Sequence, residues 1–409
     1  MRTVDEHLSA VLSQVHPLEP FAISLLESRG CVIAEDVTAP WPLPAFDAAA
    51  VDGYAVVVSD IARASAANPV TLNVIATIDA GERPTKGLFP GAAIRVSAGA
   101  VLPEGTEAVI AREHTEGDDN TVTVLQPATV GQYVRRKAED VAIGEVVVTA
   151  GSTVDARILG LLAAVGRQSV NARPRPRVVV VSVGSELQEA GAAIELGRIP
   201  DSNGVMLSAA VAEHGGVSYR VGPLTSDPAK VAQTLEDQLV RADLVLVTGG
   251  TSAASYDIIA QAMESLGEVA FHRIAMQPGA AQGFGFLGDD NIPVMVLPGN
   301  PVAAFVSFEV FVRPVLRRLL GYKEERNIMV RAKLDTAIAS TNDRRHFIRA
   351  TREISANGVH VVRPLEEQGV HLVGGLARTE CLIVVPDSVT QLSQGDDVDV
   401  LLLTDSAMW

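Results

Sequence analysis

The chain has 409 residues, of which 47% are hydrophobic and 20% charged, so at roughly 100–200 residues per domain we expect about two to four domains. Its formal net charge of −16 argues against nucleic acid or an anionic membrane surface as a partner, because both bind basic faces. The first residues lack the apolar core of a signal peptide, and no stretch approaches the ~20 apolar residues of a membrane span, so we expect a cytoplasmic protein without direct membrane insertion.

The first part of the chain predicts a helical region that is interrupted by a small β-domain. Helical periodicity covers residues 3–30, and a second helical pattern covers residues 154–166. Short β-rich runs, separated by Gly, Pro, Asn and Asp, cover residues 54–58, 70–78, 92–97, 108–112 and 121–125. We therefore expect a helical linker or dimer domain from residues 1–44 and 137–172, with a β-domain inserted at residues 45–136.

The remaining sequence predicts an α/β domain followed by a second small β-domain. Apolar runs suited to strands buried on both faces cover residues 178–181, 244–247 and 294–297. Helical patterns alternate with these runs and begin near residues 202, 228, 256 and 301. The last helix should reach Gly321, with a kink at Pro314. The alternation is typical of a doubly wound parallel sheet, which we expect at residues 173–325, before a C-terminal β-domain at residues 326–409.

Three loops of this predicted sheet follow the carboxyl ends of its strands, where open parallel sheets bind their ligands. They contain the candidate ligand-binding residues Gly184, Ser185, Gly249, Gly250, Thr251, Ser252, Pro298, Gly299, Asn300 and Pro301. Glycines let a ligand approach the backbone, and the helices that follow direct N–H groups at an anion. The three loops together predict an anion-binding site.

These loops resemble those of the molybdopterin molybdenumtransferases, the MoeA family that includes the E domain of gephyrin. The resemblance spans nearly the whole chain and is carried by Phe46–Ala55, Asp201–Asn203, Leu297–Pro301, Arg344–Arg349 and Gln368–Leu372. It implies an elongated homodimer of a multidomain fold: a MogA-like doubly wound domain, an interrupted helical domain, an inserted β-domain and a C-terminal β-barrel-like domain. It also implies insertion of molybdate into adenylylated molybdopterin, with a divalent cation and release of AMP.

The resemblance also implies roles for individual residues. The positions that correspond to catalytic groups of the family are Asp52, Asp140, Glu186, Asp227, Asp257 and Arg273. Of these, Glu186 and Asp257 would bind Mg²⁺, a cation that prefers carboxylate and phosphate oxygens. Two of the carboxylates have simpler interpretations, since Asp227 can cap a helix and Asp140 can be a solvated surface residue.

The chain departs from the family pattern where positive charge would be needed. In the family segment KxAMKPGKP, Gln277 and Ala280 stand here at two lysine positions, although Gln277 keeps a polar side chain that can contact the ligand. Ala254 replaces a glycine of the neighbouring loop. Hydrogen bonds to charged groups contribute roughly 1.5–3 kcal/mol each, so losing two should weaken oxyanion binding by orders of magnitude. We therefore interpret the molybdenum-insertion site as eroded.

Three functions follow from this interpretation. The favoured one is a gephyrin-like dimeric scaffold that binds the peptide tail of a membrane receptor or a bacterial tubulin homologue in cell division, which would recruit the protein to the membrane or division site. The alternatives are an active transferase, in which Arg135 and Arg273 replace lysines, and a nucleotide-binding regulator. Phe305, Phe308 and Phe311 are expected in the core first, and in a peptide groove second.

Overall fold

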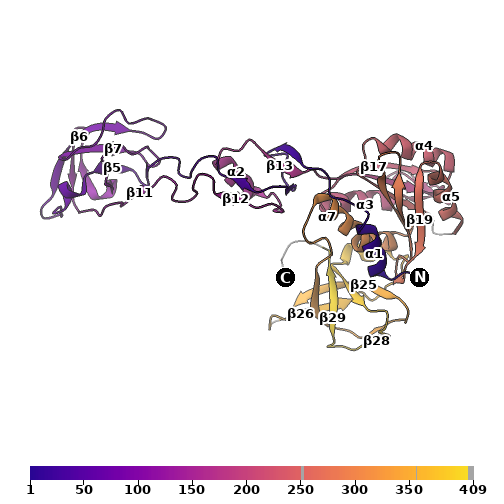
Figure 1. Cartoon of the computed structure of the whole chain (residues 1–409). Helices are drawn as coiled ribbons and strands as arrows, with labels where there is room; N and C mark the ends of the chain where they lie inside the picture. Colours follow the sequence, from indigo (N-terminus) through magenta and orange to yellow (C-terminus); the bar gives the residue numbers. More distant parts are fainter. Residues whose placement is uncertain (250–252, 356, 404–409) are drawn as a thin grey trace. The chain divides into compact units, whose positions relative to one another are not determined.

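The computed structural model describes residues 1–249, 253–355 and 357–403, which form two compact units (Figure 1). The first unit contains Met1–Phe21, Gly30–Val32 and the described part of Ala172–Trp409. The second contains Ala22–Arg29 and Ile33–Asn171. The chain therefore passes between the units more than once, and each unit is described by itself.

The second unit is built around a six-stranded sheet with the order β8-β5-β7-β6-β10-β9. Its strands are β5 (Gly53–Val56), β6 (Val70–Ile78), β7 (Ala92–Val96), β8 (Ala108–Ala111), β9 (Thr115–Gly117) and β10 (Thr121–Val124), with 3-10 turns η1 (Val58–Ile61) and η2 (Arg112–His114). Apolar side chains pack on both of its faces, with Ile110 in one cluster and Val109 in the other. Each of the five predicted β-rich runs overlaps one of these strands.

The predicted helix over residues 3–30 is wrong beyond Leu12. Helix α1 covers Val4–Leu12 only, because Pro17 and Pro20 lack the N–H that a continuing helix would need. The flanking segments form short strands: β1 (Phe21–Ser24), β2 (Val32–Ile33), β3 (Val37–Thr38), β4 (Ala48–Ala49), β11 (Val134–Arg135), β12 (Val146–Val148) and β13 (Ser169–Arg173). Helix α2 (Ala156–Ala164) lies in the second unit and α1 in the first, so the expected helical domain is not helical as a whole. The four predicted domain boundaries stay predictions.

The first unit contains a six-stranded sheet with the order β17-β14-β18-β22-β21-β19. The strands are β14 (Arg177–Val183), β17 (Val217–Leu224), β18 (Leu244–Gly249), β19 (Gly267–Arg273), β21 (Ala281–Leu287) and β22 (Ile292–Leu297). The first four strands in this order are parallel, whereas β21 runs antiparallel to its neighbours β22 and β19, so the sheet is mixed rather than wholly parallel. The connection at residues 288–291 is too short for the crossover that a parallel pair requires.

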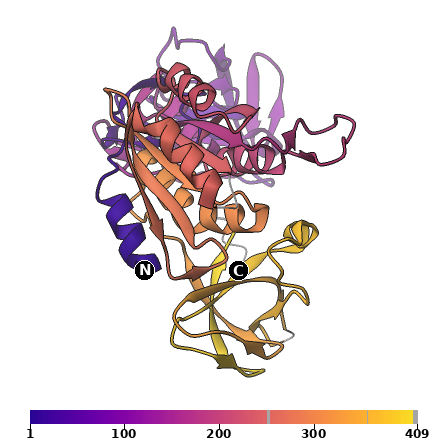
Figure 2. The same cartoon turned by 90° about the vertical axis from the view of Figure 1, so that its right-hand side faces the viewer.

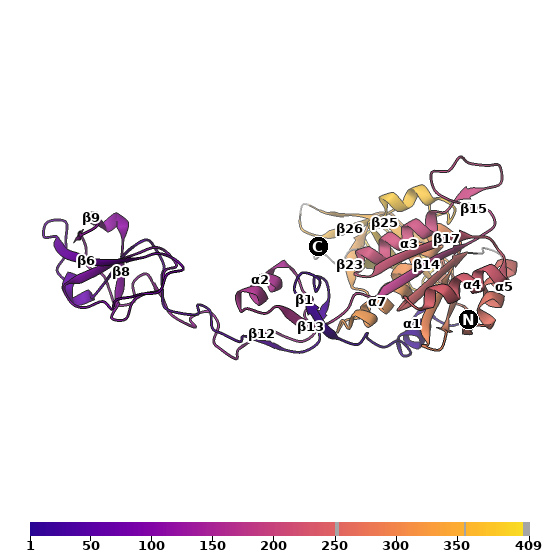
Figure 3. The same cartoon turned by 90° about the horizontal axis from the view of Figure 1, so that it is seen from above.

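Helices cover both faces of this sheet (Figures 1 and 3). They are α3 (Ser202–Glu213), α4 (Pro228–Leu239), α5 (Ala253–Glu264), α6 (Pro301–Ser307) and α7 (Arg313–Leu320). One core contains side chains of α1, α3, α6 and α7, and the core on the other face contains those of α4 and α5. No helix among the described residues is long and apolar enough to cross a membrane.

The last helical region is interrupted by a π-helical turn, η3 (Phe308–Val312), which lies directly before Pro314. The predicted kink is thus a widened turn, consistent with a proline that has no N–H to donate to the preceding turn. Phe308 and Phe311 are fully buried in the core, while Phe305 is partly buried. The expected core packing is confirmed for the two buried rings.

The C-terminal part of the first unit is a second six-stranded sheet, with the order β20-β25-β26-β23-β29-β27 (Figure 2). Its strands are β20 (Met276–Gln277), β23 (Met329–Leu334), β25 (Arg345–Ile354), β26 (His360–Pro364), β27 (Cys381–Val385) and β29 (Asp397–Leu402), with β24 (Ile338–Ala339), β28 (Gln391–Leu392) and η4 (Val373–Arg378) nearby. An additional β25–β27 pairing makes the sheet barrel-like. Strand β20 brings the segment around Gln277 to this sheet.

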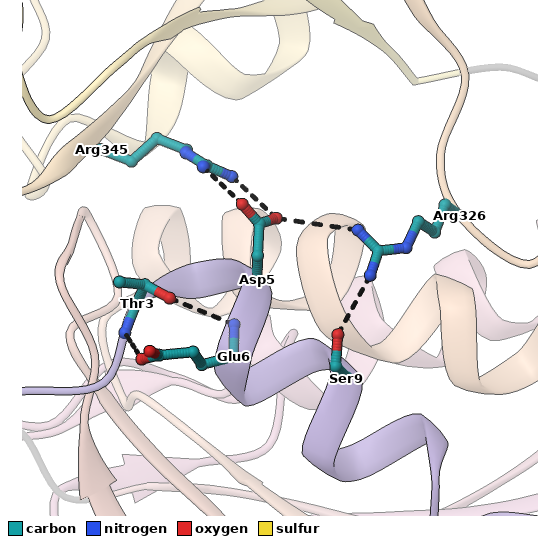
Figure 4. Close-up of polar contacts among 6 residues, drawn as sticks. All are labelled: Thr3, Asp5, Glu6, Ser9, Arg326 and Arg345. Carbon is teal, nitrogen blue, oxygen red and sulfur yellow. Dashed lines mark hydrogen bonds and ion pairs between the residues drawn. The ribbon is translucent and has the colours of Figure 1, made fainter.

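The first turn of α1 is held to the C-terminal part of the unit by charged side chains (Figure 4). Arg345 donates to both carboxylate oxygens of Asp5 at 2.7 and 3.2 Å, and Arg326 lies 3.9 Å from the same carboxylate. Thr3 and Glu6 form a capping box that satisfies backbone N–H groups at the helix start. The short helix that the sequence analysis overextended is therefore fixed at its amino end.

Candidate functional site

The loops at the carboxyl ends of β14, β18 and β22 enclose a cavity of about 360 Å³. Thr248 of β18 pairs with Ser182 of β14 and with Leu297 of β22, so the three loops leave the sheet at the same level. The cavity wall includes Asn203 and Gly299 as well as the two polar strand residues. The sequence prediction that these strand ends form one site agrees with this geometry.

Hydrogen bonds join the three walls of the cavity. Asn203 Nδ2 donates to Thr248 Oγ1 at 2.9 Å and to the carbonyl oxygen of Gly299 at 2.8 Å. Thr248 Oγ1 donates in turn to the carbonyl oxygen of Pro298 at 3.0 Å. Asn203 is 7% exposed and Thr248 is 1% exposed, so water competes little for these bonds. The cavity is thus fixed before a ligand enters.

Two helices begin at the cavity, and both are capped by their own side chains. Asp201 Oδ1 accepts from the N–H of Gly204 at 2.9 Å at the start of α3. Asn300 Oδ1 accepts from the N–H groups of Val302 and Ala303 at 3.1 and 3.2 Å at the start of α6. Because these caps already use first-turn N–H groups, the helix starts offer an anion less than the sequence analysis assumed.

Two buried polar atoms of the cavity residues have no hydrogen-bond partner among the described residues: Ser182 Oγ and Asn203 Oδ1. Buried polar atoms nearly always have a partner, so a ligand that supplies N–H or hydroxyl groups suits this wall. Neither residue was among the predicted site residues. Asn203 had a signal in the Asp201–Asn203 motif, whereas Ser182 had none because it follows a run of valines in a buried strand.

The glycines of the loops serve the packing of strands as much as the approach of a ligand. Gly249 has φ of 158°, and a Cβ there would lie 2.2 Å from the carbonyl oxygen of Val183 on the neighbouring strand. The N–H of Gly184 donates to the carbonyl oxygen of Leu224 at 2.9 Å. Ser185 is exposed and exchanges hydrogen bonds with Ser226. The predicted residues Gly250, Thr251 and Ser252 lie outside the described residues.

The predicted acidic residues of the first unit lie in different settings. Glu186 is exposed at the cavity rim, and Asp257 is exposed on α5. Asp227 caps α4, accepting from the N–H of Ala229 at 3.1 Å, as its helix-cap interpretation requires. Among the described residues, no group of three or more His, Cys, Asp and Glu could hold a metal ion. The Mg²⁺ site formed by Glu186 and Asp257 therefore stays a prediction.

The predicted residues of the second unit line a different cavity or lie on loops. Asp52 accepts from the N–H of Ala98 at 2.7 Å and lines a cavity of about 420 Å³ together with Arg112 and Glu113. Asp140 is exposed, and its backbone N–H donates to the carbonyl oxygen of Leu43. Asp52 thus shares its cavity with the cation Arg112, and Asp140 is a solvated surface residue.

The segment that has lost two lysine positions lies outside the wall of the 360 Å³ cavity. Gln277 is exposed on β20, and its Oε1 accepts from Arg344 of the C-terminal part at 3.4 Å. The carbonyl oxygen of Ala280 accepts from the N–H of Ile274 at 2.6 Å, which closes the loop. Arg273 is exposed at the end of β19. Arg344 thus contacts this loop through Gln277 and Arg273 precedes it, while Arg2 and Arg345 form backbone hydrogen bonds with Ala275.

Three family models match successive parts of the chain. The MoeA N-terminal region (domain I and II) matches residues 2–166, the probable molybdopterin binding domain matches residues 179–318, and the MoeA C-terminal region (domain IV) matches residues 331–403. The cavity described above therefore lies in the part that matches the probable molybdopterin binding domain. The gap between the second and third matches contains the linker with Arg326.

Relatives and solved structures match the whole length of the chain. It is 37% identical to Molybdopterin molybdenumtransferase 1 of Mycobacterium tuberculosis, covering 98% of this chain and 99% of that protein. Molybdopterin molybdenumtransferase 2 of the same organism is also 37% identical, with 99% and 100% covered. The structure of a molybdopterin biosynthesis MoeA protein from Pyrococcus horikoshii is similar with a TM-score of 0.79 at 30% identity, covering 99% of both chains. The predicted multidomain fold is confirmed, and the dimer stays a prediction.

Proposed function

The chain belongs to the MoeA family, and from this we propose that it is a molybdopterin molybdenumtransferase, which inserts molybdate into adenylylated molybdopterin and releases AMP. This was the alternative of the sequence analysis rather than its favoured function. The observation that carries the proposal is the cavity of about 360 Å³ at the strand ends of the domain matched by the molybdopterin-binding model.

The cavity suits the pterin part of this substrate. Its volume falls within the roughly 300–1,000 Å³ of ordinary small-molecule sites. Asn203 Oδ1 and Ser182 Oγ, which lack partners among the described residues, accept hydrogen bonds from the ring N–H and amino groups after a small side-chain shift. Thr248 and Gly299 hold Asn203 in place through its other amide atom. The wall has no cation, and its charged residues are the carboxylates Glu186 and Asp201, so it recognises the heterocycle and positive charge for the oxyanions comes from elsewhere.

The chain lacks two of the family's lysines that would bind the charged end of the substrate. Gln277 and Ala280 supply no cation, so Arg344, 3.4 Å from Gln277, and Arg273 provide the positive charge near this loop. Both arginines belong to the same unit as the cavity. A planar guanidinium can bind an oxyanion through two N–H groups, so turnover is slow rather than absent. The Mg²⁺ site of Glu186 and Asp257 stays a prediction, and no step is assigned to it.

Molybdate-dependent release of AMP from adenylylated molybdopterin by the purified protein tests the proposal. We expect slow release from the unmodified chain and release at least about tenfold faster after Gln277→Lys with Ala280→Lys, because each restored charged contact contributes roughly 1.5–3 kcal/mol. Gln391→Lys, an exposed glutamine on β28, is the matched control and should not change the rate. Absence of release from both the unmodified and the double-lysine protein, each folded, would overturn the proposed activity.

The scaffold function, its receptor or tubulin-like partner, the homodimer and recruitment to the membrane or division site stay predictions. No contact or exposed patch of the described residues favours a particular peptide. The two buried phenylalanines of the last helical region are unavailable for a groove, because Phe308 and Phe311 are fully buried. Fluorescence anisotropy with labelled receptor-tail peptides would test the scaffold function, and no binding at micromolar concentration would exclude those peptides.

A further inference from the structure

We propose that Arg220 is a positioning residue that fixes one wall of the cavity by joining the start of α3 to a loop that forms the cavity rim. We call this loop, residues 187–200, the strap. The proposal rests on the proposed function, because it assigns the strap and Arg220 to substrate binding. Arg220 lies on β17, outside every motif that the sequence analysis used, and it does not line the cavity itself.

The guanidinium of Arg220 contacts two carboxylates at once. It donates through both terminal nitrogens to Glu189 of the strap, with one distance of 2.7 Å, and through NH2 to Asp201 Oδ2 at 3.1 Å. Asp201 is 1% exposed, and its other oxygen caps α3. These hydrogen bonds, first of all that with Glu189, raise the pKa of Arg220 above its usual range. One side chain therefore links a buried helix cap to an exposed loop.

The strap reaches the cavity only at its base. Strands β15 (Leu187–Gln188) and β16 (Ile199–Pro200) pair with each other there, and Leu187, Ile199 and Pro200 belong to the cavity wall. The rest of the strap projects from the α/β part of the unit (Figure 3). Ile194 and Leu196 in this projecting part are 72% and 106% exposed, so no apolar packing holds it down. Arg198 holds the base of the strap to the carbonyl oxygens of Ser185 and Leu187, and the contact of Arg220 with Glu189 ties that base to β17.

The close approach of Arg220 to Asp201 requires a glycine at position 204. A Cβ on Gly204 would lie 2.4 Å from Asp201 Oδ2 and 2.9 Å from Arg220 Nε. The same Cβ would lie 2.9 Å from Ser182 Oγ on the cavity side. The first turn of α3, which contains Asn203, thus packs directly against the Arg220–Asp201 ion pair. A shift of this ion pair therefore moves Asn203, which joins the cavity walls.

Removing the side chain of Arg220 or of Glu189 should make the strap more mobile without changing any residue that contacts the reacting atoms. In Arg220→Ala, the buried carboxylate of Asp201 loses its cation and the strap loses its anchor. In Glu189→Ala, only the strap is released, and because Glu189 is 56% exposed this variant should fold normally. We expect KM to rise by about tenfold in the first variant and about threefold in the second, with kcat nearly unchanged.

The matched control is a similar ion pair at the opposite end of the same sheet. Arg177 donates to Asp243 at 2.8 and 3.1 Å at the amino end of β14, far along the strands from the cavity. Arg177→Ala removes a bidentate pair of the same kind and should leave KM unchanged. Arg220→Lys keeps the charge but not the fork-shaped contact, so it should recover part of the loss.

Two measurements decide the proposal: steady-state AMP release, and hydrogen exchange of the amides of residues 187–204 in the full-length protein. Faster exchange there in Arg220→Ala and Glu189→Ala but not in Arg177→Ala, with the rise in KM, supports it. Unchanged exchange overturns the anchoring, and faster exchange with unchanged KM overturns the role in substrate binding. If the unmodified protein releases no AMP, the proposed function fails, and the exchange pattern alone decides whether Arg220 orders the cavity wall.

Discussion

Replacing Asn203 by alanine should destabilise the first unit by about 2–4 kcal/mol. The amide nitrogen of Asn203 donates to Thr248 Oγ1 at 2.9 Å in the interior and to the carbonyl oxygen of Gly299 at 2.8 Å in a partly buried position. Two hydrogen bonds contribute roughly 0.5–1.5 kcal/mol each, and the carbonyl of Gly299 left without its donor adds about 1 kcal/mol, the low end of the usual range because it is only partly buried. Thr248 still donates to the carbonyl oxygen of Pro298, which limits the loss.

Differential scanning calorimetry would measure this change, because the two compact units can unfold in separate transitions. The transition of the first unit should shift to lower temperature, while that of the second unit should not move. Asn73→Ala, at an exposed position of β6 in the second unit, is the matched control and should shift neither transition. An Asn203→Ala protein with an unchanged first-unit transition would refute the claim that this side chain joins the cavity walls.

Three further predictions concern single sites of the first unit. Burial, and after it the charges of His272 and Arg2, lower the pKa of His7 from 6.5 to about 4. Between these values the unfolded state binds more protons than the folded state, so the free energy of unfolding should fall by up to about 3 kcal/mol as the pH falls through this window. His7→Phe should remove this pH dependence, as measured by urea titrations. Asp5→Asn should lower the free energy of unfolding by less than about 1 kcal/mol, because Asp5 is half exposed, and about 1 M NaCl should abolish the difference. Gly249→Ala should lower the free energy of unfolding by at least about 2 kcal/mol, because its Cβ would lie 2.2 Å from a backbone carbonyl oxygen of β14. In Gly374→Ala the Cβ would meet no atom within 4 Å, so the same urea titration should show a far smaller loss.

Local sequence signals predicted the elements of the α/β part well because each signal acts within a few residues. Asp201, Asp227 and Asn300 precede helix starts and cap them in the structure. The same kind of signal was overlooked near the amino terminus. Helical periodicity over residues 3–30 outweighed Pro17 and Pro20, although each removes a backbone donor that the helix would need.

The candidate site was only partly predictable, since its walls are joined by contacts between distant segments. The order of strands and loops placed the three loops at one sheet edge. The hydrogen bonds from Asn203 to Thr248 and Gly299 span 45 and 96 positions, and no pattern within one loop encodes them. Arg220 contacts residues 31 and 19 positions away and lies in a strand with no motif. Neither contact has the fixed spacing that makes a helix cap recognisable.

In the proposed function, the cavity recognises the heterocycle and the loop with Gln277 and Ala280 contacts the oxyanions. The cavity wall around Asn203 contains no cation, whereas the lost lysine positions, Gln277 and Ala280, lie on a loop that is not part of that wall. Substitutions at sites without shared partners usually have additive effects on free energy. The double-lysine change should therefore raise molybdate-dependent turnover in the native and Asn203→Ala proteins by the same factor. A factor that depends on residue 203 would show that the loop and the cavity act as one site.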